Sequence, residues 1–184
     1  MQVNVELNPI AEQHKSVLAN LIQLYCYDFS EIRGYDLTAH GTFTYRYLDH
    51  YFIEDTREAC FITAGGTLAG FTMTRRLDEG VREVSEFFVT RRHRRHGTGR
   101  AAAHQLFRRH PGPWQLAFDH ANHPAARFWP HITGTIADGP VHRTERYPPD
   151  VASPRTWLRL HVRSHDIAKR PQPNRSGERL WSPH

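Results

Sequence analysis

The stretch that decides the fold runs from Glu86 to Ala102 and reads EFFVTRRHRRHGTGRAA. Its aromatic and β-branched start is typical of a strand. A basic loop follows, ends in two glycines, and leads into an alanine-rich amphipathic segment at 100–110 that predicts a helix. Glycine lets the backbone approach a ligand closely, and the free N–H groups at a helix start attract phosphate. We therefore predict a strand–loop–helix unit that binds a phosphate.

The same region concentrates positive charge in a chain whose formal net charge is +5. No Asp or Glu lies between positions 90 and 118, where the arginines are Arg91, Arg92, Arg94, Arg95, Arg100, Arg108 and Arg109. Such a local positive field attracts a polyanion, either nucleic acid or a phosphorylated cofactor. A solvated helix face would give the same pattern, so charge alone leaves the partner open.

Hydrophobic periodicity predicts the elements before this unit. Strands are expected at 3–7, 59–64, 68–75 and 81–90, with a helix at 10–26, a loop at 27–44 and a short helix at 45–51. Gly65-Gly66 is typical of a tight hairpin turn between two of these strands. The segment before the basic loop is therefore an antiparallel meander.

After the unit, strands are expected at 114–118 and 156–162, and further strand material at 133–136 and 141–147. A short helix is expected at 124–132, with Asn122 as its N-cap and Pro130 kinking or shortening its end. The order of elements predicts an α/β fold of the α+β kind. It is a mixed, mostly antiparallel twisted sheet flanked by helices.

Length and composition place these elements in one domain. The 184 residues suit a single core, which we assign to 1–163, and the stretch at 164–184, rich in Pro, Arg, Ser and His, is expected to be a mobile tail. No apolar run approaches the roughly 18 residues of a membrane span, and no signal peptide is evident. With only Cys26 and Cys60, a disulfide framework is not indicated. A cytoplasmic protein is expected.

Besides a site for a phosphorylated cofactor, the glycine loop has two other interpretations, namely a dinucleotide site and a turn that binds no ligand. Gly97 to Ala102 fits the dinucleotide pattern G-x-G-x-x-A, and Asp119 lies 20 residues beyond Gly99. Against this, six basic residues separate Thr90 from Gly97, and the preceding strands form a meander instead of opening a βαβ unit. The glycines could also serve only to turn the chain before a helix.

The loop resembles motif A of the GNAT N-acetyltransferase family, whose signature is [Gln/Arg]-x-x-Gly-x-[Gly/Ala]. Arg94-Arg95-His96-Gly97-Thr98-Gly99 matches this signature in full. Downstream, Asn122, Ala125 or Ala126, and Phe128-Trp129 are similar to the family's motif B, an Asn, an Ala and a Phe-Tyr pair. The resemblance spans about residues 3–162 and is specific for CoA binding but not for the acceptor.

The resemblance implies an N-acetyltransferase that uses acetyl-CoA and acetylates a primary amine of a small molecule. The residues it implies for CoA binding are Phe88, Val89, Arg94, Arg95, His96, Gly97, Thr98, Gly99, Arg100, Asn122, Phe128 and Trp129. Loop N–H groups would bind the pyrophosphate and the main chain at 88–89 the pantetheine arm. The alternative is a non-catalytic module that binds CoA or nucleic acid through its arginine loop.

The candidate catalytic residues are two glutamates on the strand before the loop. An alkyl amine titrates near pKa 10, so it needs a base, and a carboxylate among apolar neighbours can have a raised pKa. Glu86, beside two phenylalanines, is the preferred base, and Glu83 is the second candidate. Trp129 stands where the resemblance implies a tyrosine that protonates the leaving thiolate, which puts the usual acid in doubt.

The acceptor site is expected in the N-terminal half, where acidic and aromatic residues mix. The candidates are Tyr25, Tyr27, Asp28 and Glu31, a set that suits a cationic amine. No metal site is expected, although His93-x-x-His96 and His120-x-x-His123 have ligand-like spacing, because neither pair has a cysteine partner. We expect a monomer or homodimer with a small-molecule partner and neither a membrane nor a nucleic acid.

Overall fold

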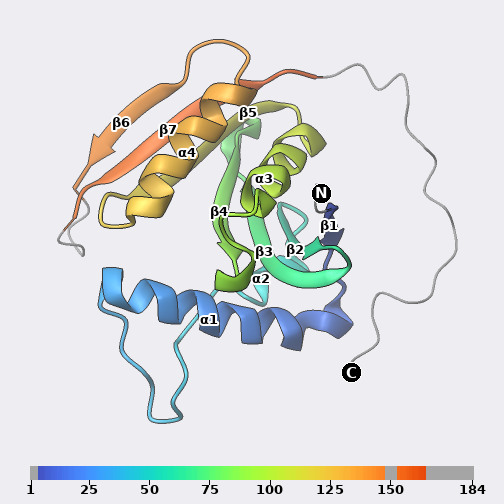
Figure 1. Ribbon diagram of the computed structural model, residues 1–184, viewed down its shortest axis with the longest axis vertical. Coiled ribbons are helices and arrows are strands. Elements are labelled where there is room, and N and C mark those ends of the chain that lie inside the picture. The colour runs from blue at the N-terminus through green and yellow to red at the C-terminus, as the bar shows by residue number, and fades with distance from the viewer. Residues whose placement is uncertain (1–3, 148–152, 165–184) are drawn as a thin grey trace, which may run out of the picture.

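The computed structural model describes residues 4–147 and 153–164, and a sheet of seven strands forms its centre (Figure 1). The strands are β1 (Val5–Pro9), β2 (Arg57–Ala64), β3 (Thr67–Arg76), β4 (Arg82–Val89), β5 (Gly112–Asp119), β6 (His142–Arg146) and β7 (Arg155–Val162), and their order in the sheet is β1-β2-β3-β4-β5-β7-β6. The α-helices in the described ranges are α1 (Lys15–Arg33), α2 (His50–Ile53), α3 (Thr98–Arg109) and α4 (His123–Ile136).

Neighbouring strands run antiparallel except at the centre, where β4 and β5 are parallel. The predicted mixed, mostly antiparallel sheet is thus confirmed. β4 and β5 pair only where Arg82–Val84 face Trp114–Leu116. Beyond Val84 the two strands diverge, as Figure 1 shows, so the second half of β4 has a free edge toward an opening in the sheet.

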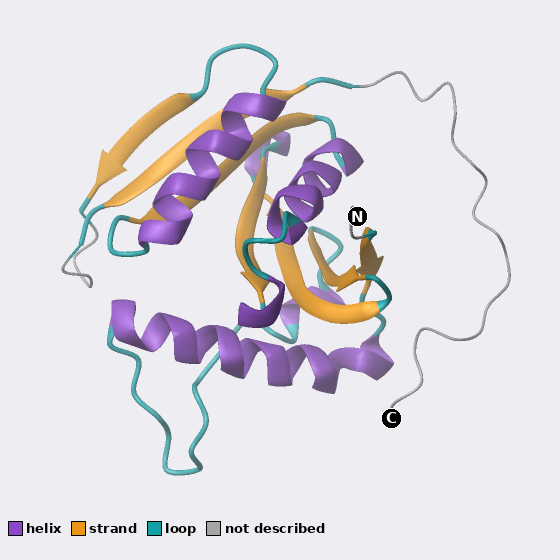
Figure 2. Ribbon diagram, in the orientation of Figure 1, coloured by secondary structure: helices purple, strands orange, loops and turns teal. Residues whose placement is uncertain are grey.

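Helices cover both faces of the sheet (Figure 2). Side chains alternate along a strand, so one strand serves two cores. On β2, Phe61 packs with α1 and α2, whereas Ile62 packs with α3 and α4 on the other face. The core under α1 and α2 draws its described strand residues from β2, β3 and β4 only. The same face of β5 and β7 is therefore left without a covering helix.

Helix α1 extends further than the sequence predicted. The stretch 27–33, expected as the start of a loop, is its last two turns. Phe29 lies one turn beyond Cys26 and continues the apolar face, and the helix ends at Gly34, whose φ of 66° is left-handed. The N–H of Gly34 donates to the carbonyl oxygen of Ser30 at 2.8 Å, a usual C-terminal closure.

Helix α4 corrects two further predictions. It continues through Pro130 to Ile136, so residues 133–136 are helical and not strand, and Pro130 does not end the helix. Trp129, Ile132 and Thr133 are buried, and their packing outweighs the hydrogen bond that Pro130 cannot donate. The Thr133 hydroxyl donates to the Trp129 carbonyl oxygen at 2.9 Å. The predicted cap is confirmed, because Asn122 Oδ1 accepts from the Ala125 N–H at 3.2 Å.

The remaining elements agree with the sequence within a few residues, including β6 inside the expected 141–147. The short helix is displaced, to 50–53 from the expected 45–51. The strand expected at 3–7 begins at Val5 and continues to Pro9; residue 4 is not part of it, and residue 3 lies outside the described ranges. The tail expected at 164–184 lies outside them as well, apart from its first residue.

Candidate active site

A cavity of about 860 Å³ occupies the opening between β4 and β5. Its walls come from the middle of β4, the end of β5, the C-terminal half of α1 and the loop that follows α1, with β7 and α4 on the far side. The predicted catalytic pair, Glu83 and Glu86, lines it. The divergence of two parallel strands thus creates the space and brings the candidate carboxylates into it.

Glu86 is the carboxylate whose environment is most unusual. It accepts hydrogen bonds from the hydroxyls of Tyr25 and Tyr45, the latter at 3.2 Å. Burial raises the pKa of Glu86 above its ordinary value, and the hydrogen bonds from the two tyrosines oppose this rise. Burial and the adjacent Glu86 charge raise the pKa of both phenols, so Tyr25 and Tyr45 stay protonated as donors.

A β-bulge at Ser85 decides which way Glu86 points. Across the β3–β4 ladder, Met73 faces Glu86 and Thr74 faces Val84, so Ser85 is an extra residue without an opposite partner. Val84 and Phe87 both pack on the α3 side of the sheet, which strict alternation forbids. The bulge therefore turns Glu86 to the α1 side, where the tyrosines lie, and the sequence carries no glycine or proline that would reveal it.

Glu83 is held by partners on both oxygens. Arg75 Nε donates to Oε1 at 2.7 Å, and Gln115 Nε2 donates to Oε2 at 2.6 Å. One donor to Glu83 is thus a guanidinium, whereas both donors to Glu86 are phenols. The structure thus gives the two candidates different surroundings, and Glu86 combines a raised pKa with hydrogen bonds from two phenols in the cavity wall.

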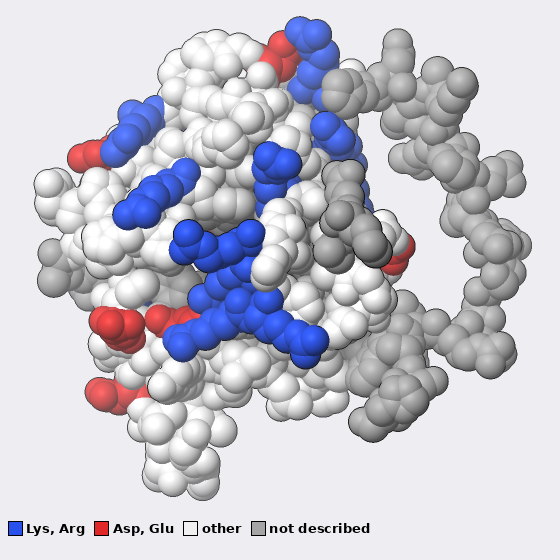
Figure 3. All heavy atoms as spheres, viewed as in Figure 1, with Lys and Arg blue, Asp and Glu red and all other residues white. Residues whose placement is uncertain are grey.

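The glycine loop forms as the sequence predicted, between β4 and α3. Gly97 occupies the N-cap of α3 with φ of 81°, and an added Cβ there would meet nothing within 4 Å. The N–H groups of the first turn of α3 are therefore open to a ligand. Lys and Arg side chains gather in the middle of the face that carries this loop (Figure 3). Arg95, His96 and Arg100 are exposed.

Arg94 braces the loop instead of standing free. Its Nε donates to the Val89 carbonyl oxygen at 2.7 Å, and its terminal nitrogen pairs with Asp28 on α1. Arg91 pairs with the same carboxylate at 2.7 Å. These two ion pairs lower the pKa of Asp28. Asp28, proposed from the sequence for the acceptor, thus lies against the phosphate loop and outside the cavity lining.

Of the other residues expected at the acceptor site, Tyr25 lines the cavity, whereas Tyr27 and Glu31 are exposed on the outer side of α1. Asn122 and Trp129 line the cavity from α4. Phe128 lies 3.5 Å from where a Cβ on Gly99 would be, next to the loop. Phe88 is buried against α1, so only its backbone faces the open edge. Thr98 is buried.

Sequence reasoning missed Tyr45 and an ion cluster at the far rim. Asp119, 3% exposed, accepts from Arg33 at 2.7 Å and lies 3.2 Å from Arg155 Nε. Arg33 is the last residue of α1, and Asp119 is the last residue of β5. Among the described residues, no group of three or more His, Cys, Asp or Glu side chains is arranged to hold a metal ion. In the same part of the chain no helix has the length and apolar character needed to cross a bilayer.

Comparison with known families decides what this arrangement is. The profile of the acetyltransferase (GNAT) family matches residues 21–134, more than half of the chain. The chain belongs to the GNAT acetyltransferase family. Acetyl-CoA is accordingly its cofactor, and the dinucleotide interpretation of the glycine loop is wrong. The curated protein sequences contain no significant match to the chain.

Solved structures of other acetyltransferases share the fold. An acetyltransferase from Thermus thermophilus is 16% identical with a TM-score of 0.66, covering 88% of this chain and 99% of its own. A putative streptothricin acetyltransferase from Bacillus anthracis in complex with acetyl coenzyme A is 13% identical with a TM-score of 0.54, covering 87% and 99%. A spermidine N-acetyltransferase from Vibrio cholerae, in a mutant form, is 9% identical with a TM-score of 0.56, covering 85% and 93%.

Proposed function

We propose that this GNAT acetyltransferase is an N-acetyltransferase that transfers acetyl from acetyl-CoA to a primary amine of a small molecule, with Glu86 as general base. The observation that carries the proposal is the environment of Glu86. It is a carboxylate with a raised pKa, held by Tyr25 and Tyr45 at the centre of the cavity. A base of that kind suits an acceptor that arrives protonated, as an amine does.

The loop and the free edge of β4 supply the proposed donor site. The N–H groups at the start of α3, from 97 to 100, would hold the pyrophosphate, with Arg95, His96 and Arg100 at hand. Arg94 and Arg91 would act by keeping the loop in place through Asp28. The edge of β4 that β5 leaves free beyond Val84 would pair with the extended pantetheine arm as an added strand would, apart from the Val89 carbonyl oxygen, which accepts from Arg94.

Acetyl-CoA supplies an acetyl thioester, so transfer forms a C–N bond at the amine and breaks the C–S bond of the donor. The protonated amine loses two protons in all: Glu86 would accept the one that frees the nitrogen lone pair, and the one released as the amide forms passes through solvent to the CoA thiolate. Free backbone N–H groups of β4 near the bulge would polarise the thioester carbonyl. Trp129 is packed edge-to-face against Phe87 with ring centres 5.2 Å apart, and its indole N–H is no acid. A thiol with a pKa of about 8.5 can leave as thiolate without one.

The proposal is tested by measuring CoA thiol release from acetyl-CoA with a panel of primary amines and of alcohols of matched size. Turnover with amines, and little with alcohols, is expected for the wild type. Binding of acetyl-CoA without turnover of any amine would overturn the catalytic proposal while leaving the family membership intact. Faster turnover with alcohols than with amines would overturn the assignment of the acceptor group.

A further inference from the structure

A row of polar side chains crosses the sheet beside the cavity, at the end away from the phosphate loop. Directly opposed residues link it from strand to strand: Arg57, Arg75, Glu83, Gln115 and Arg159, on β2, β3, β4, β5 and β7. Opposed residues in a sheet point to the same face. The odd-numbered neighbours of Arg57 on β2, Ala59 and Phe61, pack with α1, so the row lies on the α1 face.

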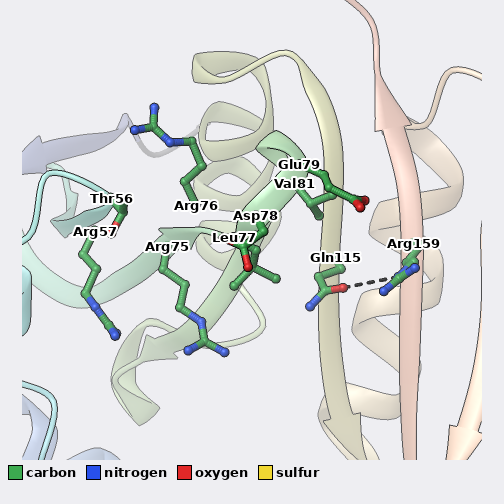
Figure 4. Close-up of a pocket in the computed structure, with 10 residues that line it drawn as sticks. All are labelled: Thr56, Arg57, Arg75, Arg76, Leu77, Asp78, Glu79, Val81, Gln115 and Arg159. Atoms are coloured by element: carbon green, nitrogen blue, oxygen red, sulfur yellow. Dashed lines mark hydrogen bonds between the residues drawn. The ribbon is translucent and has the colours of Figure 1, made fainter.

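Hydrogen bonds join the row into one network. Glu83 accepts from Arg75 and Gln115, and Gln115 Oε1 accepts from Arg159 Nε at 3.3 Å. Figure 4 shows Arg57 and Arg75 extending side by side from neighbouring strands, and the bond between Gln115 and Arg159. The row holds three arginines and one carboxylate. Two like charges directly opposite each other, as Arg57 and Arg75 are, disfavour the sheet, so the arrangement needs a compensating anion.

The carboxylates of the protein neutralise the arginines of the row only in part. Glu54 pairs with Arg57 at 2.6 Å and Glu83 pairs with Arg75, whereas Arg159 has no carboxylate partner among the described residues. The walls of the main cavity carry five arginines against three carboxylates. The adjoining cavity of about 450 Å³, which shares Arg57 and Arg75, carries four arginines against two. Both linings therefore hold more arginines than carboxylates, and Arg159 is the row's guanidinium left over once Glu54 and Glu83 are paired, which suits an anion.

The positions of residues along strand β4 give the distance between the candidate base, Glu86, and the row of arginines. Val89, at its loop end, is next to the donor site, Glu86 lies in the middle, and Glu83 lies in the row. Three residues of strand span roughly 10 Å. An amine that reaches Glu86 from the side opposite the donor would direct its other end toward the arginines.

We infer that the acceptor is an amine that also carries an anionic group, a carboxylate or a phosphate, which Arg75 and Arg159 bind. The inference rests on the proposed N-acetyltransferase function. It departs from the acceptor that acidic residues on α1 suggested, because Asp28 and Glu31 line neither cavity, whereas Arg75 lines both and Arg159 lines the adjoining one. Guanidinium groups bind carboxylate and phosphate through paired hydrogen bonds, so the row would also orient the amine.

The test compares amines of equal length that differ only in their second end group. The probes are 4-aminobutyrate and 6-aminohexanoate, the alkylamines and α,ω-diamines of the same lengths, and 2-aminoethyl phosphate, with thiol release as the readout. For the wild type, we expect kcat/KM for the best anionic amine to exceed that of its matched diamine at least about 100-fold, equivalent to about 2.7 kcal/mol. The carboxylate and phosphate probes separate the two anions. Equal or faster turnover of alkylamines or diamines would overturn the inference.

Substitutions of Arg159 test whether the row causes the preference for anionic amines. Arg159→Gln should reduce the preference for anionic amines about 10-fold or more, and Arg159→Glu should shift it toward diamines, a gain that misfolding cannot produce. Arg108→Gln, an exposed change of the same charge on α3, is the control and should leave the preference unchanged. A preference that none of the Arg159 changes alters would overturn the assignment of the site. If calorimetry shows that acetyl-CoA binds but no amine of any charge is acetylated, the proposed function fails and the inference with it.

Discussion

Glu86 is an ionisable group whose buried surroundings disfavour its charged form. A substitution that removes only the ability to ionise therefore tests its chemical role. Burial raises its pKa, and hydrogen bonds from two phenols, together with the charges of Arg33 and Arg155, partly compensate the ionised form. Glu86→Gln keeps the shape and can still hydrogen-bond both tyrosines, but it cannot accept a proton. We expect kcat for amine acetylation to fall about 10²–10⁴-fold, with no loss in thermal midpoint because a buried charge is removed.

The measurement is steady-state thiol release together with thermal unfolding. Glu83→Gln is the matched comparison, since that carboxylate already accepts from Arg75 and Gln115. Its kcat should fall less than that of Glu86→Gln. The assignment of the base is wrong if the ranking of the two variants is reversed.

Tyr25 tunes Glu86, and the direction of its effect can be derived. The Tyr25 hydroxyl donates to the carboxylate and so opposes the rise in pKa. In Tyr25→Phe the ionised form loses a donor, and the pKa of Glu86 rises further. A hydrogen bond to a charged group is worth about 1.5 kcal/mol, or about one pKa unit. Because the base must be ionised to act, the acid limb of the kcat/KM profile should move upward by about one pH unit. Tyr27→Phe, exposed on the same helix, should leave the profile in place.

At the scale of elements, the strand–loop–helix unit was predictable because its signals are local. Gly97 has a left-handed φ of 81°, which favours glycine, and the alanines that follow it have high helix propensity. The bulge at Ser85 was not predictable, since it depends on how β3 and β4 register and no residue type marks it. Helix α4 runs through Pro130 because buried neighbours hold it, an effect of packing that local propensity does not contain.

The prediction for the glycine loop concerns Gly97 and the binding of acetyl-CoA. Gly97→Glu places bulk, negative charge and an unfavourable positive φ where the proposed pyrophosphate site lies. We expect acetyl-CoA binding, measured by isothermal titration calorimetry, to be lost. Gly139→Glu is matched in backbone strain, with φ of 103° and no atom within 4 Å of an added Cβ, but lies in the loop after α4. It should bind acetyl-CoA as the wild type does, and equal loss in both variants would show general damage instead of a phosphate site.

Close approach of two strands gives a second prediction. A Cβ on Gly70 of β3 would lie 2.0 Å from the Phe88 carbonyl oxygen, so Gly70→Ala must push β4 aside at the donor edge. We expect a loss of about 3 kcal/mol in the free energy of unfolding. Gly134→Ala on α4 meets nothing within 4 Å and should gain up to about 1 kcal/mol through helix propensity. Urea unfolding of both variants checks the pair, and a stability for Gly70→Ala as high as that of Gly134→Ala would contradict the packing argument.

At the scale of the whole molecule, the cavity exists because two halves of one sheet separate, and contacts must hold the halves at the right distance. The sequence predicted the helices and strands but not this opening, because β4 and β5 are parallel and their divergence depends on α1, β5 and β7 meeting in space. Asp119 was noticed only for its distance from Gly99. In the structure it joins the end of α1 to β5 and β7 through Arg33 and Arg155.

This ion cluster yields the largest expected change in stability. Asp119 is 3% exposed, and Arg33 and Arg155 are both largely sheltered. Asp119→Asn leaves two guanidinium groups close together in a poorly hydrated place, and breaking a buried pair in this way costs about 3–5 kcal/mol. Asp138→Asn is the matched control, because it breaks the exposed pair with Arg163, where a loss below about 1 kcal/mol is expected. Urea unfolding measures both. A loss for Asp119→Asn as small as that of the control would mean that the cluster does not hold the two halves together, and the spacing of the cavity would then have to come from the sheet alone.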